Sequence, residues 1–176
     1  MSYAFHIDVT RCSGCEACVV ACSDQNDLEA AEARDAWRRV FHLESGDYPS
    51  FEAVHVSLGC MHCEDAPCLM ACPTGALRRD AATAAVLTDA ALCIGCHSCL
   101  VACPFGVPRF GPSGKMEKCT MCAERVAVGL EPACVRVCPT RALSFGPANT
   151  LRETAGLDAA ERLARTRRTL WESPSS

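Results

Sequence analysis

The stretch CIGCHSCLVACP, residues 93–104, places four cysteines and a proline within twelve positions. The same arrangement recurs along the chain, because each of the sixteen cysteines belongs to one of four such quartets. The quartets, in chain order, are Cys12, Cys15, Cys18 and Cys22; Cys60, Cys63, Cys68 and Cys72; Cys93, Cys96, Cys99 and Cys103; and Cys119, Cys122, Cys134 and Cys138. This regularity predicts one kind of site, built four times.

The spacing within a quartet points to iron–sulfur clusters. The first and third quartets read C-x2-C-x2-C-x3-C, and proline follows the last cysteine in every quartet except the first, where Ser23 stands. C-x2-C-x2-C-x3-C-P is the ferredoxin pattern for a [4Fe–4S] cluster. The third and fourth cysteines lie one helical turn apart, so the fourth can reach a neighbouring cluster, and the proline ends the short helix. Sixteen thiols at four per cluster account for four clusters with none left over.

Two other uses of cysteine compete with this interpretation. A disulfide framework suits a secreted chain, but it does not require four nearly identical quartets. Zinc also takes C-x2-C pairs, but zinc sites usually combine two pairs across a longer gap and rarely add a third cysteine at the same spacing. Both alternatives are less consistent with the pattern than four cubane clusters.

Composition limits the function classes. The formal net charge of −4 gives no sign of a nucleic-acid surface, and the 49% apolar content includes the cysteines. A chain of 176 residues can form one compact domain, yet few large apolar side chains are available for its core. The N-terminus lacks the basic and apolar segments of a secretory signal, and no stretch is long and apolar enough to span a membrane. We therefore expect cytoplasmic assembly, with any membrane association or co-export arising through a partner subunit.

The order of the quartets predicts an α+β fold of two nested ferredoxin-like modules. The second and third quartets are adjacent and form one two-cluster unit, so the first and fourth must pair across it. We expect a single body over residues 1–149, with module A formed by 1–39 and 111–149, and module B by 52–110. A C-terminal helix and tail would follow over 150–176.

Short strands and hairpins are expected between the quartets. Alternation of apolar and polar residues predicts a strand at 3–8 and a hairpin from 37–43 and 51–58 around a turn-rich loop. Further hairpins are expected within 75–89 and 107–118, and a strand at 141–145. A helix over 158–170 is suggested by Asp158 and Glu161, which resemble a capping box, and residues 172–176 are expected to be disordered.

The chain resembles a known family at this level of detail. The words HIDVTRCSGCEACVVAC (6–22), CMHCEDAPCLMACPTGAL (60–77), CIGCHSCLVACPFGVPRF (93–110) and CTMCAERVAVGLEPACVRVCPTRALSFGP (119–147) are similar to the four-cluster iron–sulfur subunits of DMSO-reductase-type molybdenum enzymes. Some relatives replace a cysteine of the third quartet with tryptophan and carry a [3Fe–4S] centre. Cys96 and Cys99 are intact here, so the resemblance implies four [4Fe–4S] clusters.

The resemblance also implies a set of iron ligands for each cluster, in which the last cysteine is exchanged between quartets. The implied sets are Cys12, Cys15, Cys18 and Cys138 for cluster 1; Cys119, Cys122, Cys134 and Cys22 for cluster 2; Cys60, Cys63, Cys68 and Cys103 for cluster 3; and Cys93, Cys96, Cys99 and Cys72 for cluster 4. All metal in the chain would be iron held by these sixteen cysteines.

The function that follows is electron transfer without a catalytic site. Fully ligated clusters offer no open iron, and the sequence contains no phosphate-binding loop or convincing nucleophile–base pair. The resemblance implies a large molybdenum or tungsten pterin catalytic subunit as partner, with a quinol-linked membrane anchor subunit or another redox carrier at the other end. The alternatives are a free-standing polyferredoxin serving a hydrogenase or formate dehydrogenase, and a non-redox structural or sensor protein.

Several polar residues near the quartets have a plainer interpretation. His62 and His97 are expected to be structural or surface residues whose N–H groups can reach a cluster sulfur, because the irons need no imidazole. Lys115, Lys118, Arg125 and Arg141 flank the fourth quartet. A cation beside a cluster favours its reduced state, but solvated surface is the expectation for any one of these four.

Overall fold

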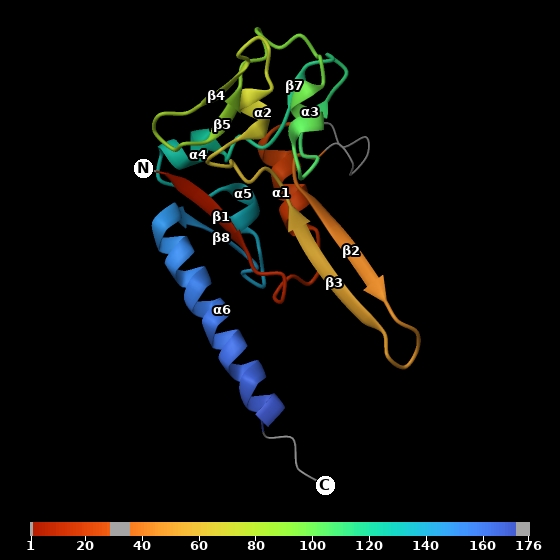
Figure 1. Cartoon of the computed structure of the whole chain (residues 1–176). Helices are drawn as coiled ribbons and strands as arrows, with labels where there is room; N and C mark the ends of the chain where they lie inside the picture. The colour runs from red at the N-terminus through yellow and green to blue at the C-terminus, as the bar shows by residue number, and fades with distance from the viewer. Residues whose placement is uncertain (1, 29–35, 172–176) are drawn as a thin grey trace.

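The computed structural model describes residues 2–28 and 36–171 (Figure 1). Its elements, in chain order, are β1 (Tyr3–Ile7), α1 (Ala17–Gln25), β2 (Arg39–Ser45), β3 (Glu52–Leu58), α2 (Pro67–Met70), β4 (Leu77–Arg79), β5 (Val86–Thr88), α3 (Ser98–Ala102), β6 (Arg109–Phe110), β7 (Met116–Glu117), α4 (Ala123–Ala127), α5 (Ala133–Arg136), β8 (Leu143–Pro147) and α6 (Ala148–Trp171). The α+β class and the expected strands and hairpins are confirmed.

A helix carries the third cysteine of each quartet, and only α1 is long enough to carry the fourth as well. In α2, α3 and α5 the helix has four or five residues, and Pro73, Pro104 and Pro139 follow shortly after it. In α1 no proline interrupts the chain after Cys22, and the helix runs for nine residues. The missing N–H and the ring of proline prevent the helix from continuing, which explains the difference.

All strands of the described chain lie in four two-stranded antiparallel sheets. β1 pairs with β8 over the full length of both strands, from Tyr3 opposite Pro147 to Ile7 opposite Leu143. This pairing joins the beginning of the chain to the segment that follows the fourth quartet. β4 pairs with β5, and β6 with β7, as tight local hairpins.

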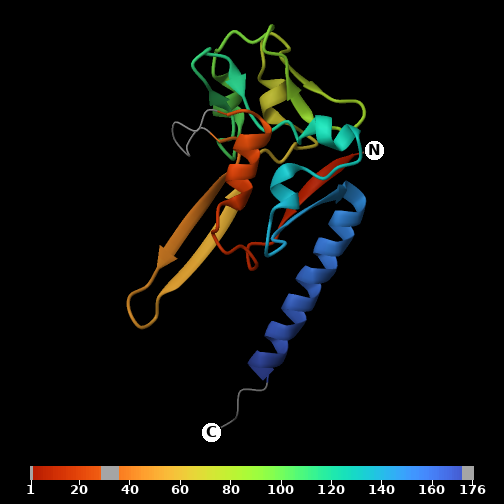
Figure 2. The ribbon, with the colours of Figure 1, turned by 180° about the vertical axis from the view of Figure 1, so that it is seen from behind.

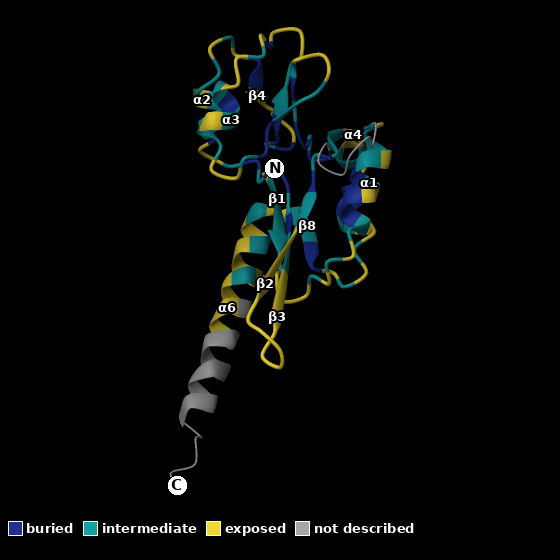
Figure 3. Cartoon of the chain, turned by 90° about the vertical axis from the view of Figure 1, so that its right-hand side faces the viewer, coloured by how far each residue is buried: buried dark blue, intermediate teal, exposed yellow. Residues whose placement is uncertain are grey.

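The β2–β3 hairpin is the longest sheet and projects from the body (Figure 1). It pairs Arg39 with Leu58 at its base and Ser45 with Glu52 near its tip. The base is partly buried and the outer half is exposed (Figure 3). Views from opposite sides show that the hairpin and α6 extend away from the body in the same general direction (Figure 2).

The core consists of three small groups of buried residues in which cysteine is prominent. One lies around Leu77 and Val86, one around Val19 and Leu143, and one around Val107. Cysteines of the quartets belong to every group, and alanine supplies much of the remaining buried surface. The quartet cysteines are therefore part of the hydrophobic core itself.

The C-terminal helix is confirmed, but its predicted beginning is wrong. α6 starts at Ala148, directly after β8, and the N–H of Ala148 donates to the carbonyl of Ser2 at 2.9 Å. Positions 158 and 161 lie inside this helix, so they do not form its N-terminal cap. The expectation for residues 172–176 lies outside the described residues. Among the helices that the structure describes, none combines the length and apolarity needed to cross a membrane.

Candidate metal centres

Left-handed backbone positions turn the first and third quartets into tight loops. The glycine before the second cysteine has a positive φ in both: 71° at Gly14 and 67° at Gly95. The residue after that cysteine also has a positive φ, 58° at Glu16 and 63° at His97. A Cβ on Gly95 would lie 2.5 Å from the carbonyl oxygen of Gly114. The glycines are therefore required both by the turn and by the close approach of another segment.

Two cavities are lined by four cysteines each, and in both the cysteines come from two quartets. Cys12, Cys15 and Cys18 line one cavity together with Cys138, the last cysteine of the fourth quartet. Cys93, Cys96 and Cys99 line the other together with Cys72, the last cysteine of the second quartet. The structure thus brings together, in one cavity each, the residues expected for clusters 1 and 4.

The thiols expected for cluster 2 also lie near one another. Burial raises the pKa of Cys22 to about 12, and the charges of Cys134 and Cys122 act in the same direction. Burial likewise raises the pKa of Cys119 to about 12, with Cys134 again contributing. Like charges raise a thiol pKa only at short range, so these four residues form a neighbourhood.

The residues expected for cluster 3 show the same relationship. Burial raises the pKa of Cys60, and the nearby charges of Cys63 and Cys103 raise it further. Burial also raises the pKa of Cys68, on which Cys60 and Cys103 act in turn. These four residues are therefore neighbours in the fold, and the pKa of Cys119 shows that Cys60 also lies near the residues expected for cluster 2.

The last cysteines of the second and fourth quartets share a local motif, C-P-T-x-A-L. Burial alone would raise the pKa of Cys72, but hydrogen bonds from the N–H of Leu77 and from Thr74 outweigh it and lower the pKa. At Cys138 the N–H of Leu143 and the hydroxyl of Thr140 have the same net effect. Donors aimed at sulfur stabilise the thiolate, which is the form that binds iron.

Further backbone donors point at sulfur in other quartets. The N–H groups of His62, Met116 and Met121 lie 3.4 Å from the sulfurs of Cys60, Cys93 and Cys119 respectively. Hydrogen bonds of this kind stabilise thiolate ligands and tune the reduction potential of a cluster.

The donor set fits iron–sulfur clusters. All sixteen cysteines, each within the described ranges, are free of disulfide bonds. Within those ranges no three His, Cys, Asp or Glu side chains converge closely enough for a single metal ion. His62 Nε2 and Trp37 Nε1 are buried without a hydrogen-bond partner in the described protein. Buried donors rarely stay unpaired, and His62 is flanked by Cys60 and Cys63, so a cluster sulfur is a fitting acceptor for it.

Comparison with known proteins gives the family. The family model described as a 4Fe-4S dicluster domain matches residues 51–148. The B subunit of the anaerobic dimethyl sulfoxide reductase of Escherichia coli is 40% identical over 163 residues, which cover 88% of this chain and 78% of the relative. The protein belongs to the family of iron–sulfur subunits of DMSO-reductase-type enzymes.

Other members of this family are similarly close. The B subunit of the anaerobic dimethyl sulfoxide reductase of Haemophilus influenzae is 37% identical over 168 residues, covering 90% of this chain and 80% of the relative. The iron–sulfur subunit of formate dehydrogenase-O of E. coli is 38% identical over 169 residues, but these cover only 56% of that longer protein. Family membership and the sixteen-cysteine pattern agree with four [4Fe–4S] clusters in an electron-transfer subunit of an oxidoreductase.

Two cations of this iron–sulfur subunit are buried beside the quartets. Arg38 is 2% exposed and Lys118 is 3% exposed. The Lys118 ammonium donates to the carbonyl oxygens of Val86 and Cys119. The expectation of a solvated surface is therefore wrong for Lys118. Arg38 was not anticipated at all, because it precedes a strand and lies far in sequence from any cysteine.

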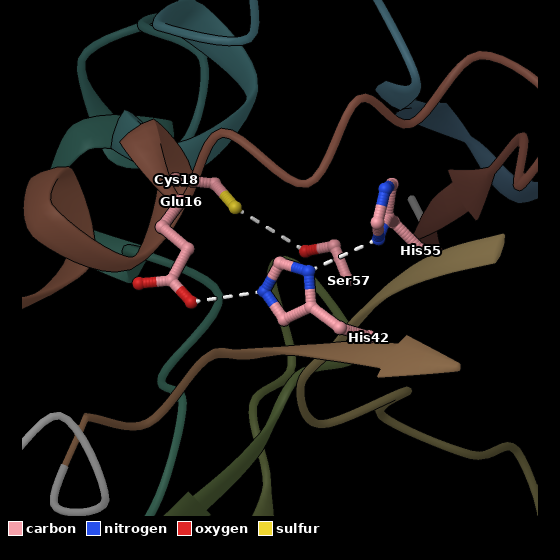
Figure 4. A network of polar contacts seen from close by, with 5 residues as sticks. All are labelled: Glu16, Cys18, His42, His55 and Ser57. Carbon is pink, nitrogen blue, oxygen red and sulfur yellow. Dashed lines mark hydrogen bonds and ion pairs between the residues drawn. The ribbon is translucent and has the colours of Figure 1, made fainter. Parts of the chain in front are cut away.

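A polar network joins the β2–β3 hairpin to the first quartet (Figure 4). His42 Nε2 lies 3.2 Å from a carboxylate oxygen of Glu16, and the Nδ1 atoms of His42 and His55 are 3.0 Å apart. A carboxylate only accepts, so His42 donates from Nε2, and in its neutral form it accepts at Nδ1 from His55. The same two rings pack against Gly14, where a Cβ would lie 2.9 Å from His55. The hairpin thus fixes the loop of the first quartet.

Proposed function

We propose that this chain relays single electrons between a catalytic subunit with a molybdenum or tungsten pterin cofactor and a membrane quinol-linked subunit or another redox carrier. The chain itself has no catalytic site in this proposal. The family membership supports an oxidoreductase complex as its setting. The observation that carries the proposal is the pair of cavities that each bring together four cysteines from two quartets.

The proposed ligand sets are those implied by the resemblance. Cluster 1 is held by Cys12, Cys15, Cys18 and Cys138; cluster 2 by Cys119, Cys122, Cys134 and Cys22; cluster 3 by Cys60, Cys63, Cys68 and Cys103; and cluster 4 by Cys93, Cys96, Cys99 and Cys72. The two cysteine-lined cavities support the sets for clusters 1 and 4. The mutual effects on thiol pKa support the sets for clusters 2 and 3.

The nested modules belong to the same proposal: module A over 1–39 and 111–149, module B over 52–110, and the helix and tail over 150–176. The pairing of β1 with β8 and the packing of α1 against α5 support module A. The packing of α2 against α3 supports module B. The β6–β7 hairpin crosses the boundary at residue 110 and serves as the link between them.

Cysteines that are close but belong to different sets support an order for the proposed clusters. Beyond the effect of burial, the pKa of Cys18 is raised by Cys134, that of Cys119 by Cys60, and that of Cys99 by Cys68. These three pairs connect cluster 1 to 2, 2 to 3 and 3 to 4. A line of four clusters is the arrangement that an electron relay requires, because each transfer then crosses a short distance.

Purification under anaerobic conditions tests the function. We expect about sixteen irons and sixteen acid-labile sulfides per chain, four for each cubane. Co-elution with a large pterin-containing chain supports the subunit, whereas a lone brown protein identifies a free polyferredoxin. Stoichiometric zinc with little iron excludes the electron-relay function altogether. Clusters that no partner reduces or re-oxidises during turnover identify a structural or sensor protein.

A further inference from the structure

Arg38 lies at the point where the first and fourth quartets meet. Its side chain is 2% exposed, directly before β2. Its backbone N–H also donates a hydrogen bond to Cys22. Burial lowers the pKa of its guanidinium, but the nearby cysteines outweigh this effect, so the net shift of the pKa is upward. The cysteines that act on it are, in decreasing order of effect, Cys134, Cys119, Cys18 and Cys22. One belongs to the cluster 1 set and three to the cluster 2 set, so this one cation is shared by two proposed clusters.

The guanidinium is held in place from three sides. Its Nη1 donates to the hydroxyl of Ser57 at 3.1 Å, and its central carbon lies 5.3 Å from the ring centre of Phe5. A Cβ on Gly59 would lie 3.1 Å from one of its nitrogens, so the absence of a side chain there leaves room for it. A buried charge fixed in this way cannot turn away when its surroundings change.

Ser57 extends the arrangement to a cluster ligand. Its hydroxyl oxygen lies 3.3 Å from the sulfur of Cys18 (Figure 4). Ser57 itself is 2% exposed. Arginine has donors only, so the serine oxygen accepts from Arg38. The single hydroxyl proton of Ser57 is then directed to Cys18. The hydrogen bonds therefore run in one direction, from Arg38 through Ser57 to the sulfur.

We propose that Arg38 is a counter-cation shared by clusters 1 and 2, which raises the reduction potentials of both, and that Ser57 donates a hydrogen bond that raises the potential of cluster 1 alone. The proposal rests on the ligand sets given above. An oxidised cluster with four thiolates carries about −2, and its reduction adds one electron and no proton. A fixed positive charge nearby stabilises the added electron, and so does a donor on a ligand sulfur. Arg38 acts through its charge and is not an iron ligand, so it tunes the clusters and is not a catalytic residue.

Potentiometric titration of the anaerobically purified full chain, followed by EPR, tests this proposal. Arg38→Gln is expected to reduce the equilibrium constant for reduction of clusters 1 and 2 by tenfold or more, which corresponds to about 59 mV for one electron. Clusters 3 and 4 should change less. Arg39→Gln is the matched control, because it removes the same charge from the next residue, whose guanidinium lies against Phe41 instead.

Three other variants separate charge from structure. Arg38→Lys keeps the charge and should retain most of the potential. Ser57→Ala should lower the reduction potential of cluster 1 only. Gly59→Ala leaves the net charge unchanged but displaces the guanidinium. It should therefore lower the potentials of clusters 1 and 2 by less than Arg38→Gln does. If Arg38→Gln fails to load its iron, Gly59→Ala and Ser57→Ala still decide the question.

The outcomes are distinct. Equal shifts in Arg38→Gln and Arg39→Gln, or equal shifts of all four clusters, overturn the proposal, as do unshifted potentials in Gly59→Ala and Ser57→Ala at full iron content. The EPR signals of clusters 1 and 2 are assigned in separate experiments, with Cys138→Ser and Cys22→Ser in the otherwise unmodified protein. The ligand sets and the electron-transfer function can therefore fail on iron content and cysteine variants alone, independently of Arg38.

Discussion

The backbone N–H of Val86 donates to Nδ1 of His62 at 3.0 Å, and this bond decides which nitrogen of the buried imidazole carries its proton. Because Nδ1 accepts, the proton of the neutral ring lies on Nε2. Burial, together with the nearby charge of Lys118, lowers the pKa of His62 well below its ordinary value. The loop between Cys60 and Cys63 is thereby fixed to the β4–β5 hairpin.

Replacing this imidazole should destabilise the protein. His62→Phe fills the same space but leaves the buried N–H of Val86 without an acceptor, which costs about 1–3 kcal/mol. We expect the visible absorbance of the clusters to be lost at a lower denaturant concentration. His97→Phe is the control, because His97 stacks on Phe110 with ring centres 3.7 Å apart and phenylalanine preserves that contact. Equal midpoints for the two variants contradict the prediction.

Gly95→Ala should impair the third quartet more than conformational strain alone can explain. The new Cβ would lie 2.5 Å from the carbonyl oxygen of Gly114, so the two loops must separate. Gly75→Ala is a matched control: its φ is also 67°, but nothing lies within 4 Å of the added Cβ. That variant should cost only the left-handed strain, about 1–2 kcal/mol. The measurement is iron content per chain, and equal iron in both variants contradicts a steric role for Gly114.

Local sequence patterns anticipated much of this structure. Alternation located β1 and the β2–β3 hairpin, and the quartet spacing located the helices that carry the cysteines. Local patterns did not reveal where α6 begins, because the capping-box pattern at Asp158 occurs inside a helix that already continues from β8.

Long-range packing was less accessible from the sequence. Lys118 stands in a polar hairpin segment, yet the fold buries it against the carbonyl of Val86. Arg38 has no cysteine near it in sequence and reaches the thiols only because β2 and β3 pack against the first quartet. One signal was present: Arg38 has the same strand parity as His42, which faces that quartet. Parity alone does not distinguish a buried cation from a solvated one.

Removing iron should unfold the protein. The buried apolar residues are chiefly cysteine, alanine and a few aliphatic side chains, so little burial remains once the clusters are gone. Chelation under anaerobic conditions is expected to abolish the cooperative thermal transition seen by circular dichroism. Holoprotein passed through the same buffer without chelator is the control. A colourless apoprotein with an unchanged melting transition is the opposite result and means that the polypeptide core suffices.

The exchange of cysteines between quartets gives the sharpest test of the architecture. Cys18 and Cys22 are both buried on α1, one helical turn apart, so their sulfurs can serve two clusters. Cys22→Ser should therefore damage the cluster held by Cys119, Cys122 and Cys134, about a hundred residues away along the sequence. The cluster of the first quartet should survive, although its cysteines are much nearer in sequence.

Cys138→Ser is the reciprocal variant, because Cys138 shares a cavity with Cys12, Cys15 and Cys18. Serine is a harder and poorer ligand for these irons than thiolate, so one iron of the affected cluster should become labile and a three-iron EPR signal should appear. The two variants should give different signals, each from the cluster of the other quartet. If each substitution instead perturbs only the cluster of its own quartet, then α1 does not bridge two clusters, and the nested arrangement of modules A and B is wrong.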